Sequence, residues 1–174
     1  MNLIRLLSQK DPLFPQAFRL YEAAFPALER RDLPQLLQIL ENPDYHMDVL
    51  LENGTFVGIL FYWDPGNLIF LEHFAICPQL RNLGYGAQAL SLLKKPGKPI
   101  LLEIEPPVDN LTCRRQDFYM RNGFLSNAYH HIQAKYRPED ADLVRKILSF
   151  PRKITQPEYD VFYRYMQTYI SCKY

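Results

Sequence analysis

The spacing of apolar positions near the start of the chain predicts a short strand followed by two helices. Residues 2–7 carry the brief apolar pattern of an edge strand. Aromatic side chains recur at helical spacing from Phe14 to Phe25, and we expect this helix to end near Pro26. Asp32 belongs to the residue types that cap helix N-termini, and leucines follow it at helical spacing, so a second helix should begin there.

An antiparallel meander is predicted next. Two apolar runs, Met47 to Glu52 and Thr55 to Trp63, flank Asn53-Gly54, a dipeptide that indicates a hairpin because both of its positions tolerate positive φ. A second turn over residues 64–67 leads into the apolar run Leu68 to Ile76. These three runs should pair as consecutive antiparallel strands.

The following stretch has the order strand, loop and helix. The strand Leu68 to Ile76 leads through residues 77–83 into a helix that opens at Gly84 and continues to Leu93. The run Ile100 to Glu105 is a further strand, and a right-handed crossover should place it parallel to the first. Glycines together with the free N–H groups of a helix start suit an anion, so we expect a phosphate-bearing ligand at residues 81–87.

The last third of the chain predicts a helix, two strands and a final helix. Thr112 to Asn122 has the helical pattern, and Gly123 is its C-terminal glycine. Leu125 to Tyr136 and Leu143 to Phe150 are expected to be strands, although the pattern of the second also permits a helix. Glu158 to Ile170 gathers its aromatic and apolar side chains on one helical face.

Composition and charge narrow the function classes. The 174 residues suit a single domain over 1–174, and 20 Lys and Arg against 19 Asp and Glu give a net charge of +1. This balance gives no support for nucleic acid or a membrane as the main partner. No apolar stretch has transmembrane length, and the N-terminus is too charged for a signal peptide. Three widely spaced cysteines suggest neither disulfides nor zinc and favour a cytoplasmic setting.

The glycines admit two interpretations. Gly84 to Ala89 fits G-x-G-x-x-A, the dinucleotide fingerprint, and Glu103 lies about where that fingerprint places its ribose-binding acid. In a Rossmann unit, however, the first glycine follows the strand almost at once, whereas seven residues separate Ile76 from Gly84 here. A Rossmann-type oxidoreductase that binds NAD is therefore kept as an alternative.

The second interpretation rests on a resemblance. Arg81-x-x-Gly84-x-Gly86 followed by Ala87 resembles the acyl-CoA pyrophosphate site of the GNAT N-acyltransferase superfamily. The segment from Phe118 to Phe124 is similar to the FYxxxGF segment that closes the fourth helix of many GNAT enzymes. The resemblance extends over roughly Asn2 to Tyr136. It implies an α/β (α+β) fold, in which helices flank a mixed, mostly antiparallel central sheet and two parallel strands splay apart.

The resemblance also implies acetyl-CoA as the co-substrate, with no metal. Loop amides would bind the pyrophosphate, the strand end would contact the pantetheine arm, and the Phe74 amide would donate to the thioester carbonyl. The implied cofactor-binding residues are Phe74, Ala75, Ile76, Arg81, Asn82, Leu83, Gly84, Tyr85, Gly86 and Ala87.

Three residues are candidates for proton transfer. Glu72 is an acid within an apolar strand, and period-two alternation places it on one face with Phe74. Burial should raise its pKa into the range of a general base, unless a Lys or Arg of a neighbouring strand pairs with it. Glu103 on the next strand is a second candidate base, with a solvated or salt-bridged carboxylate as the alternative. Tyr119, by its place in the FYxxxGF-like segment, is the candidate acid for the CoA thiolate, and a packed aromatic is the alternative.

Four other features have simpler interpretations. His73 should point to the face opposite Glu72, as a packed or exposed histidine. Either member of His130-His131 could face the acceptor, although a metal site would need more ligands. Cys77 suits a small apolar filler. The charged residues 29–31 lie where GNAT folds shape the acceptor pocket, and a solvated charge run is the alternative.

The resemblance implies transfer of an acetyl group from acetyl-CoA to a primary amine by direct attack in a ternary complex. The acceptor would be a small molecule or a peptide, and no sequence feature selects between them. A GNAT-like module that binds CoA, or nothing, without turnover is the alternative from another class. The Tyr-rich C-terminal helix could cover the pocket or form a homodimer contact.

Overall fold

A computed structural model describes residues 1–171. The chain divides into two compact units, the first over Met1–Lys98 and the second beginning at Pro99, and each is described by itself. The single domain over 1–174 stays a prediction. Cys172 lies outside the described residues. Within residues 1–171, none of the helices combines the length and the apolar character that crossing a membrane requires.

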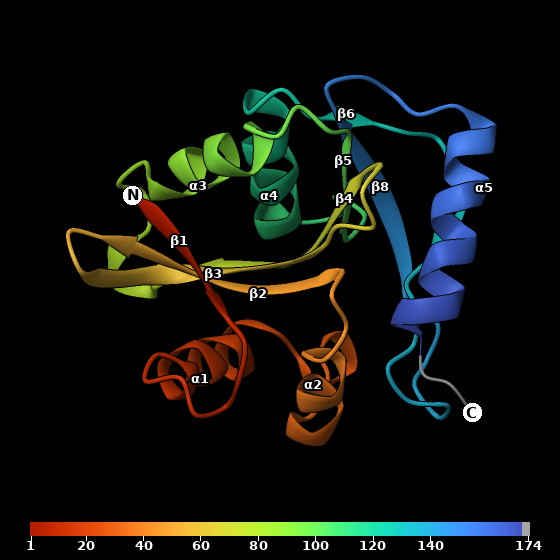
Figure 1. Ribbon diagram of the computed structural model, residues 1–174. Helices are drawn as coiled ribbons and strands as arrows, with labels where there is room; N and C mark the ends of the chain where they lie inside the picture. The colour runs from red at the N-terminus through yellow and green to blue at the C-terminus, as the bar shows by residue number, and fades with distance from the viewer. Residues whose placement is uncertain (172–174) are drawn as a thin grey trace. The chain divides into compact units, whose positions relative to one another are not determined.

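The first unit is built on an antiparallel sheet in the order β1, β2, β3, β4 (Figure 1). Its strands are β1 (Asn2–Leu6), β2 (Tyr45–Glu52), β3 (Thr55–Trp63) and β4 (Ile69–Ile76). The hairpin between β2 and β3 turns at Asn53 and Gly54, whose φ angles are 49° and 78°. Both angles are positive, as this turn requires, so the predicted meander is confirmed.

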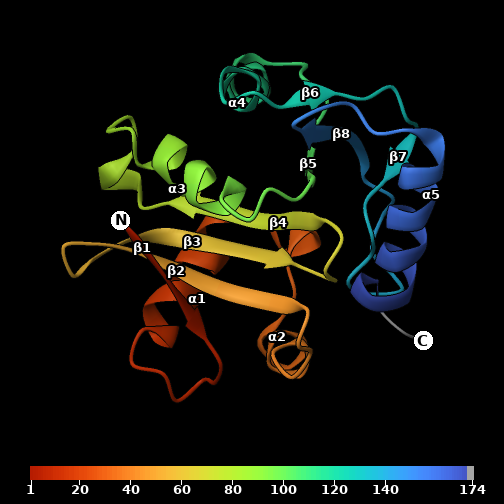
Figure 2. The ribbon, with the colours of Figure 1, turned by 45° about the horizontal axis from the view of Figure 1, so that its top comes forward.

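Helices cover both faces of this sheet (Figure 2). On one face lie α1 (Phe14–Ala24), the 3₁₀ turn η1 (Ala27–Glu29) and α2 (Leu33–Ile39). On the other lies α3 (Tyr85–Lys94), after the 3₁₀ turn η2 (Pro78–Leu80). The Asp32 side chain accepts a hydrogen bond from the Gln35 amide at 2.9 Å, which confirms it as the cap of α2. Tyr21 of α1 packs on Phe61 of β3 with ring centroids 5.4 Å apart.

A β-bulge interrupts the pairing of β3 with β4. Phe61 lies opposite His73 and Tyr62 lies opposite Leu71, so Glu72 is an extra residue in β4. A bulge breaks the alternation of side chains between the two faces of a sheet. Glu72 and His73 therefore contact the same segment, residues 29–31, on the α1 side. The prediction that His73 points away from Glu72 is wrong for this reason.

The second unit contains β5 (Ile100–Ile104), β6 (Leu125–Ser126), β7 (His131–Ile132) and β8 (Val144–Phe150). The strands β5, β6 and β7 each pair antiparallel with β8. Its helices are α4 (Asn110–Arg121) and α5 (Gln156–Tyr165), and α5 continues into the π-helical turn η3 (Met166–Ile170). The sequence pattern at 143–150, which permitted a strand or a helix, forms a strand.

The strand expected over Leu125–Tyr136 is wrong in its extent, because only β6 and β7 form within it. Asn127 explains the interruption. Its side-chain amide donates to Ser149 Oγ at 2.9 Å, and its side-chain oxygen accepts from the Ile154 amide at 3.1 Å. The Asn127 amide still donates to the Ile147 carbonyl at 2.9 Å, and the side-chain bonds draw the following segment toward Ser149 and Ile154. An Asn side chain that bonds to backbone groups favours an irregular loop.

Candidate active site

The N-terminus of α3 has the backbone geometry of an anion site. Gly84 precedes the helix with φ 83°, a left-handed conformation that glycine adopts without strain. The first helical hydrogen bond runs from the Gln88 amide to the Gly84 carbonyl at 3.2 Å. The amides of Tyr85, Gly86 and Ala87 therefore have no carbonyl partner within the helix and point outward at the positive end of its dipole.

The loop before this helix is shaped by its own backbone contacts. Arg81 is exposed, and its Nε donates to the Ile76 carbonyl at 3.2 Å, which folds the side chain back on the end of β4. Asn82 is also exposed and has φ 64°, a positive value that is uncommon outside glycine. Leu83 is 60% exposed. These residues could meet a ligand through backbone amides rather than through buried side chains.

The end of β4 lies close to β3 because residue 58 is a glycine. A Cβ added to Gly58 would lie 2.3 Å from the Ala75 carbonyl oxygen and 3.1 Å from Ile76 Cα. Gly58 and Ile76 are register partners in the sheet. Phe74 lies opposite Leu60, on the face away from His73, so the prediction that Glu72 and Phe74 share a face is also wrong.

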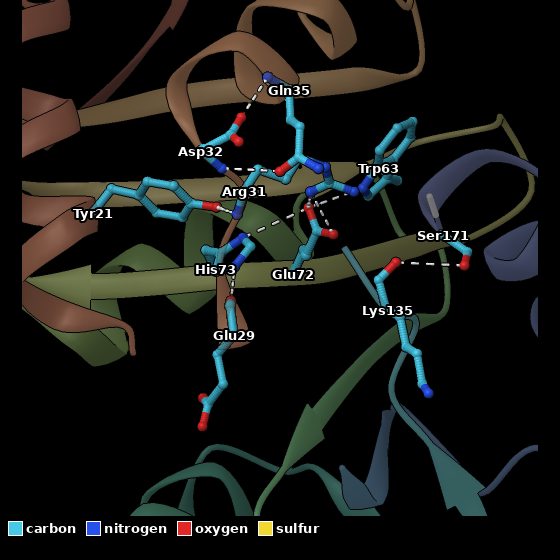
Figure 3. A network of polar contacts seen from close by, with 10 residues as sticks. All are labelled: Tyr21, Glu29, Arg31, Asp32, Gln35, Trp63, Glu72, His73, Lys135 and Ser171. Carbon is cyan, nitrogen blue, oxygen red and sulfur yellow. Dashed lines mark hydrogen bonds and ion pairs between the residues drawn. The ribbon is translucent and has the colours of Figure 1, made fainter. Parts of the chain in front are cut away.

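Glu72 is held in a buried ion pair (Figure 3). Its side chain is 2% exposed, and both of its oxygens accept from Arg31 Nη1 at 2.8 Å. The Trp63 indole N–H donates to Oε2 at 3.1 Å, and the Arg31 guanidinium lies over the Trp63 ring, 5.7 Å from its centroid. Arg31 is anchored in turn, because its amide donates to the Tyr21 hydroxyl at 2.8 Å.

The electrostatics of Glu72 are opposite to our prediction. Burial by itself would raise the pKa of this carboxyl, but the Arg31 guanidinium and the neighbouring His73 lower it to about 2. The expected rise in the pKa is therefore wrong. The alternative, pairing with a basic residue, is what the structure shows, although Arg31 comes from the segment before α2 and not from a strand.

The other features of this unit also have defined places. His73 Nε2 lies 2.8 Å from the Glu29 carbonyl oxygen, and the ring meets the edges of Tyr21 and Phe25. His73 is thus a packed histidine, as expected. Cys77 is half-buried, and burial raises the pKa of its thiol, in keeping with the filler interpretation. Among residues 1–171, no group of three or more His, Cys, Asp and Glu side chains is placed to hold a metal ion.

In the second unit, Tyr119 is fixed by the C-terminal cap of α4. The Phe124 amide donates to the Tyr119 carbonyl at 3.1 Å and the Gly123 amide to the Met120 carbonyl at 2.9 Å, with Gly123 at φ 83°. This is a Schellman motif, and the Phe124 ring completes it by packing edge-on against Tyr119 with centroids 5.6 Å apart. The spacing of the FYxxxGF-like segment is therefore what the C-terminal cap of α4 requires.

The Tyr119 hydroxyl is suited to donate a proton. Burial raises the pKa of Tyr119 to about 12, so the phenol stays protonated at neutral pH. No hydrogen bond to this hydroxyl is formed within residues 1–171. It is buried beside Phe118, with ring centroids 5.2 Å apart. Packing and proton donation are compatible for this residue.

Glu103 of β5 pairs with a histidine of the same unit. Its Oε1 lies 2.5 Å from His131 Nε2, and the Glu103 side chain is 12% exposed. Glu103 therefore has a hydrogen-bond partner, an imidazole, which forms a salt bridge with it only when the ring is protonated. Sequence reasoning noted the His130-His131 pair without linking it to Glu103, because the two residues are 28 positions apart.

Comparison with known proteins identifies the same class of protein. The family model described as acetyltransferase (GNAT) family matches residues 14–124. The chain is 33% identical over 89 residues to YjbC of Bacillus subtilis (strain 168), which is named as an acetyltransferase. That match covers 45% of this chain and 46% of YjbC, so the chain aligns with about half the length of this relative.

Solved structures share the fold over nearly the whole chain. A GNAT-family acetyltransferase structure from Bacteroides thetaiotaomicron is similar with a TM-score of 0.91 and 26% identity over 99% of this chain and 100% of that one. An aminoglycoside 6'-N-acetyltransferase in complex with coenzyme A has a TM-score of 0.63 and 16% identity over 88% of this chain and 100% of that one. The expected fold class, an α/β fold with a mixed, mostly antiparallel sheet flanked by helices, is confirmed.

Proposed function

Because the chain belongs to the acetyltransferase (GNAT) family, we propose that it moves the acetyl group of acetyl-CoA to a primary amine by direct attack in a ternary complex. The family supports acyl-CoA-dependent N-acyltransfer as the activity. We propose in addition that the acyl group is acetyl, that the reaction passes through a ternary complex, and that the residues act as follows.

The observation that carries the proposal is the N-terminus of α3. Three outward amides, a left-handed Gly84 and an exposed preceding loop combine at one point of the first unit. A pyrophosphate accepts hydrogen bonds from such amides and is favoured by the positive end of a helix dipole. In the proposal, residues 81–87 bind the pyrophosphate of acetyl-CoA, and Phe74, Ala75 and Ile76 contact its pantetheine arm.

Proton balance requires two transfers. The acceptor ammonium loses one proton before its nitrogen attacks the thioester carbonyl, and the tetrahedral intermediate loses a second as the thiolate leaves. In the proposal Glu103 accepts the first proton, Tyr119 supplies a proton to the departing thiolate, and the second nitrogen proton restores the Tyr119 phenol. Glu72 takes no part in proton transfer, because a carboxylate that accepts from Arg31 on both oxygens, with a pKa of about 2, is a weak base.

The acceptor is proposed only as an amine of a small molecule or a peptide. Proteins of the same fold are named as acetyltransferases of aminoglycosides, of spermidine and of an alanine of ribosomal protein S18. These names define a practical panel of amines for a first assay.

A thermal-shift screen with acetyl-CoA, CoA and NAD, followed by release of free CoA in the presence of each amine, tests the proposal. We expect acetyl-CoA and CoA to raise Tm and NAD to leave it unchanged. Binding of CoA without turnover of any amine would favour the non-catalytic module. Absence of a shift with either CoA species contradicts the proposal, and a shift with NAD alone would support the dinucleotide alternative.

One variant separates binding from stability. Ala87→Asp adds a negative charge to the first turn of α3, where it stabilises the helix but repels a pyrophosphate. We expect the free protein to keep its Tm while the Kd for CoA rises at least tenfold. Ser91→Asp adds the same charge one turn later, at an exposed position of the same helix, and should change the Kd far less.

A further inference from the structure

His131, Glu103 and Tyr159 form a connected chain of polar contacts inside the second unit. His131 Nε2 lies 2.5 Å from Glu103 Oε1, and His131 Nδ1 lies 2.9 Å from the Tyr159 hydroxyl. The single proton of the Tyr159 hydroxyl has two acceptors within reach, His131 Nδ1 at 2.9 Å and the His130 carbonyl oxygen at 3.2 Å. The His131 side chain is 0% exposed. These contacts join β5, β7 and α5, which are labelled on the ribbon in Figure 2.

The surroundings restrict the His131 ring further. Tyr163 and Phe162 of α5 lie against it, with ring centroids 6.1 Å and 6.0 Å away. Arg145 of β8 is its register partner, and its Nε donates to Gln133 Oε1 at 2.8 Å. Glu103, Tyr159 and Tyr163 thus contact or face the imidazole, and Arg145 lies across the strand pair from it.

Hydrogen-bond accounting assigns the ring proton. An ionised carboxylate can only accept, so Nε2 facing Glu103 must carry hydrogen for this contact to be favourable. In the neutral imidazole Nδ1 then has a lone pair, and the Tyr159 hydroxyl is placed to donate to it. Tyr159 thus selects the Nε2–H tautomer, and this tautomer holds one oxygen of Glu103.

The second oxygen of Glu103 remains available. Oε2 forms no hydrogen bond within residues 1–171, and the side chain keeps 12% of its surface exposed. A carboxylate fixed through one oxygen presents the other in a defined direction, and such orientation is a large part of general-base efficiency.

We propose that His131 and Tyr159 are positioning residues that hold Glu103 as the general base of the acyl transfer. This inference rests on the proposed function. Glu103 Oε2 takes one proton from the acceptor ammonium, and the neutral amine nitrogen forms its bond to the acetyl carbon. The carbon–sulfur bond then breaks, Tyr119 gives its phenolic proton to the departing thiolate, and the second nitrogen proton restores the phenol. The proton on Oε2 leaves to solvent after the products depart.

Two replacements of His131 distinguish positioning from packing. His131→Phe fills the aromatic site beside Phe162 but removes the donor to Glu103, and we expect kcat to fall at least 100-fold with an unchanged KM for acetyl-CoA. His131→Gln keeps an N–H donor, and its kcat should be at least tenfold higher than that of His131→Phe. His130→Gln, at an exposed neighbouring position, is the control and should match the wild type. For each variant, we first confirm that CoA raises Tm by as much as it does for the wild type.

A spectroscopic measurement tests the tautomer without turnover. The ¹⁵N shifts of the His131 ring should report hydrogen on Nε2 at neutral pH, and Tyr159→Phe should relax this preference. A proton on Nδ1 at neutral pH overturns the inference, as does a His131→Phe variant with wild-type kcat. Either result leaves the proposed function intact if the wild type acetylates an amine, whereas a wild type that turns over no amine overturns both.

Discussion

Asp48 is a buried carboxyl whose ionisation should oppose folding at neutral pH. It lies on β2 with 4% of its surface exposed, and its Oδ2 accepts from the Tyr62 hydroxyl at 3.2 Å. Its Oδ1 is buried with no hydrogen-bond partner within residues 1–171. Burial raises the pKa of Asp48 to about 6, against the weaker opposing effects of Tyr62 and Arg5.

The sign of the pH dependence follows from this direction. The folded pKa of about 6 exceeds the ordinary aspartate value of 3.8, so the folded state binds the proton more tightly than the unfolded state. The resulting stabilisation is fully present below about pH 3.8 and is lost as pH rises through 6. At 1.36 kcal/mol per unit, the full change is about 3 kcal/mol, and most of it falls between pH 4 and pH 8.

The Asp48→Asn variant measures this change directly. Asn cannot ionise, so the unfolding free energy of the variant relative to the wild type should be higher at pH 8 than at pH 4 by about 2–3 kcal/mol. Any constant cost of burying the new amide cancels in this difference. Urea unfolding of both proteins at several pH values between 4 and 8 supplies the numbers.

The matched control removes an exposed carboxylate instead of a buried one. Asp117→Asn changes an exposed position of α4. Its unfolding free energy should differ from that of the wild type by the same amount at pH 4 and at pH 8. If the unfolding free energies of Asp48→Asn and the wild type differ by the same amount at pH 4 and pH 8, the reasoning is refuted. The raised pKa of Asp48 would then have no effect on stability.

Three further outcomes follow from the contacts described. Glu72→Gln leaves the buried Arg31 without its counter-charge and should lose about 3–5 kcal/mol in urea unfolding at pH 7. This loss should shrink as pH falls from 4.5 toward 2, because the lowered pKa makes the pair stabilising only while Glu72 is ionised. Gly58→Ala places a Cβ 2.3 Å from the Ala75 carbonyl oxygen and should cost about 1–3 kcal/mol by the same assay. Tyr119→Phe should lower kcat by about 100-fold or more with an unchanged KM for acetyl-CoA, if it is the general acid.

The first two of these predictions have control variants, and the third has a result that would contradict it. The double variant Glu72→Gln with Arg31→Met should be more stable than Glu72→Gln alone, since it removes both buried charges, and a less stable double variant contradicts the ion-pair argument. Thr55→Ala, at the exposed start of β3, should stay within about 0.5 kcal/mol of the wild type. A Tyr119→Phe variant with full kcat would leave Tyr119 as a packed aromatic.

The parts of the fold that were predicted correctly depend on local backbone chemistry. Asp32 caps α2, Asn53-Gly54 turns the hairpin, and Gly123 ends α4 as the left-handed residue of a Schellman motif. Gly84 likewise begins α3 in the left-handed conformation. Each of these features is determined by residues within one turn of itself, so it can be read from a short segment.

The parts that were missed depend on contacts between distant segments. The bulge at Glu72 is a property of how β3 and β4 pair, and period-two alternation assumes that no such bulge exists. The shortened strands after α4 depend on Asn127, whose partners are as many as 27 residues away.

By itself, the sequence determined the order of elements, the glycine-marked helix start and the resemblance to GNAT enzymes. Only the tertiary structure decided which basic side chain contacts each of the two glutamates. Arg31 and Glu72 are 41 residues apart in the sequence, and Glu103 and His131 are 28 residues apart. The spacing of residues along the chain therefore predicts neither pair. The physical reason is that the ionisation of a carboxyl depends on its burial and on neighbouring charges in space, and folding alone brings these together.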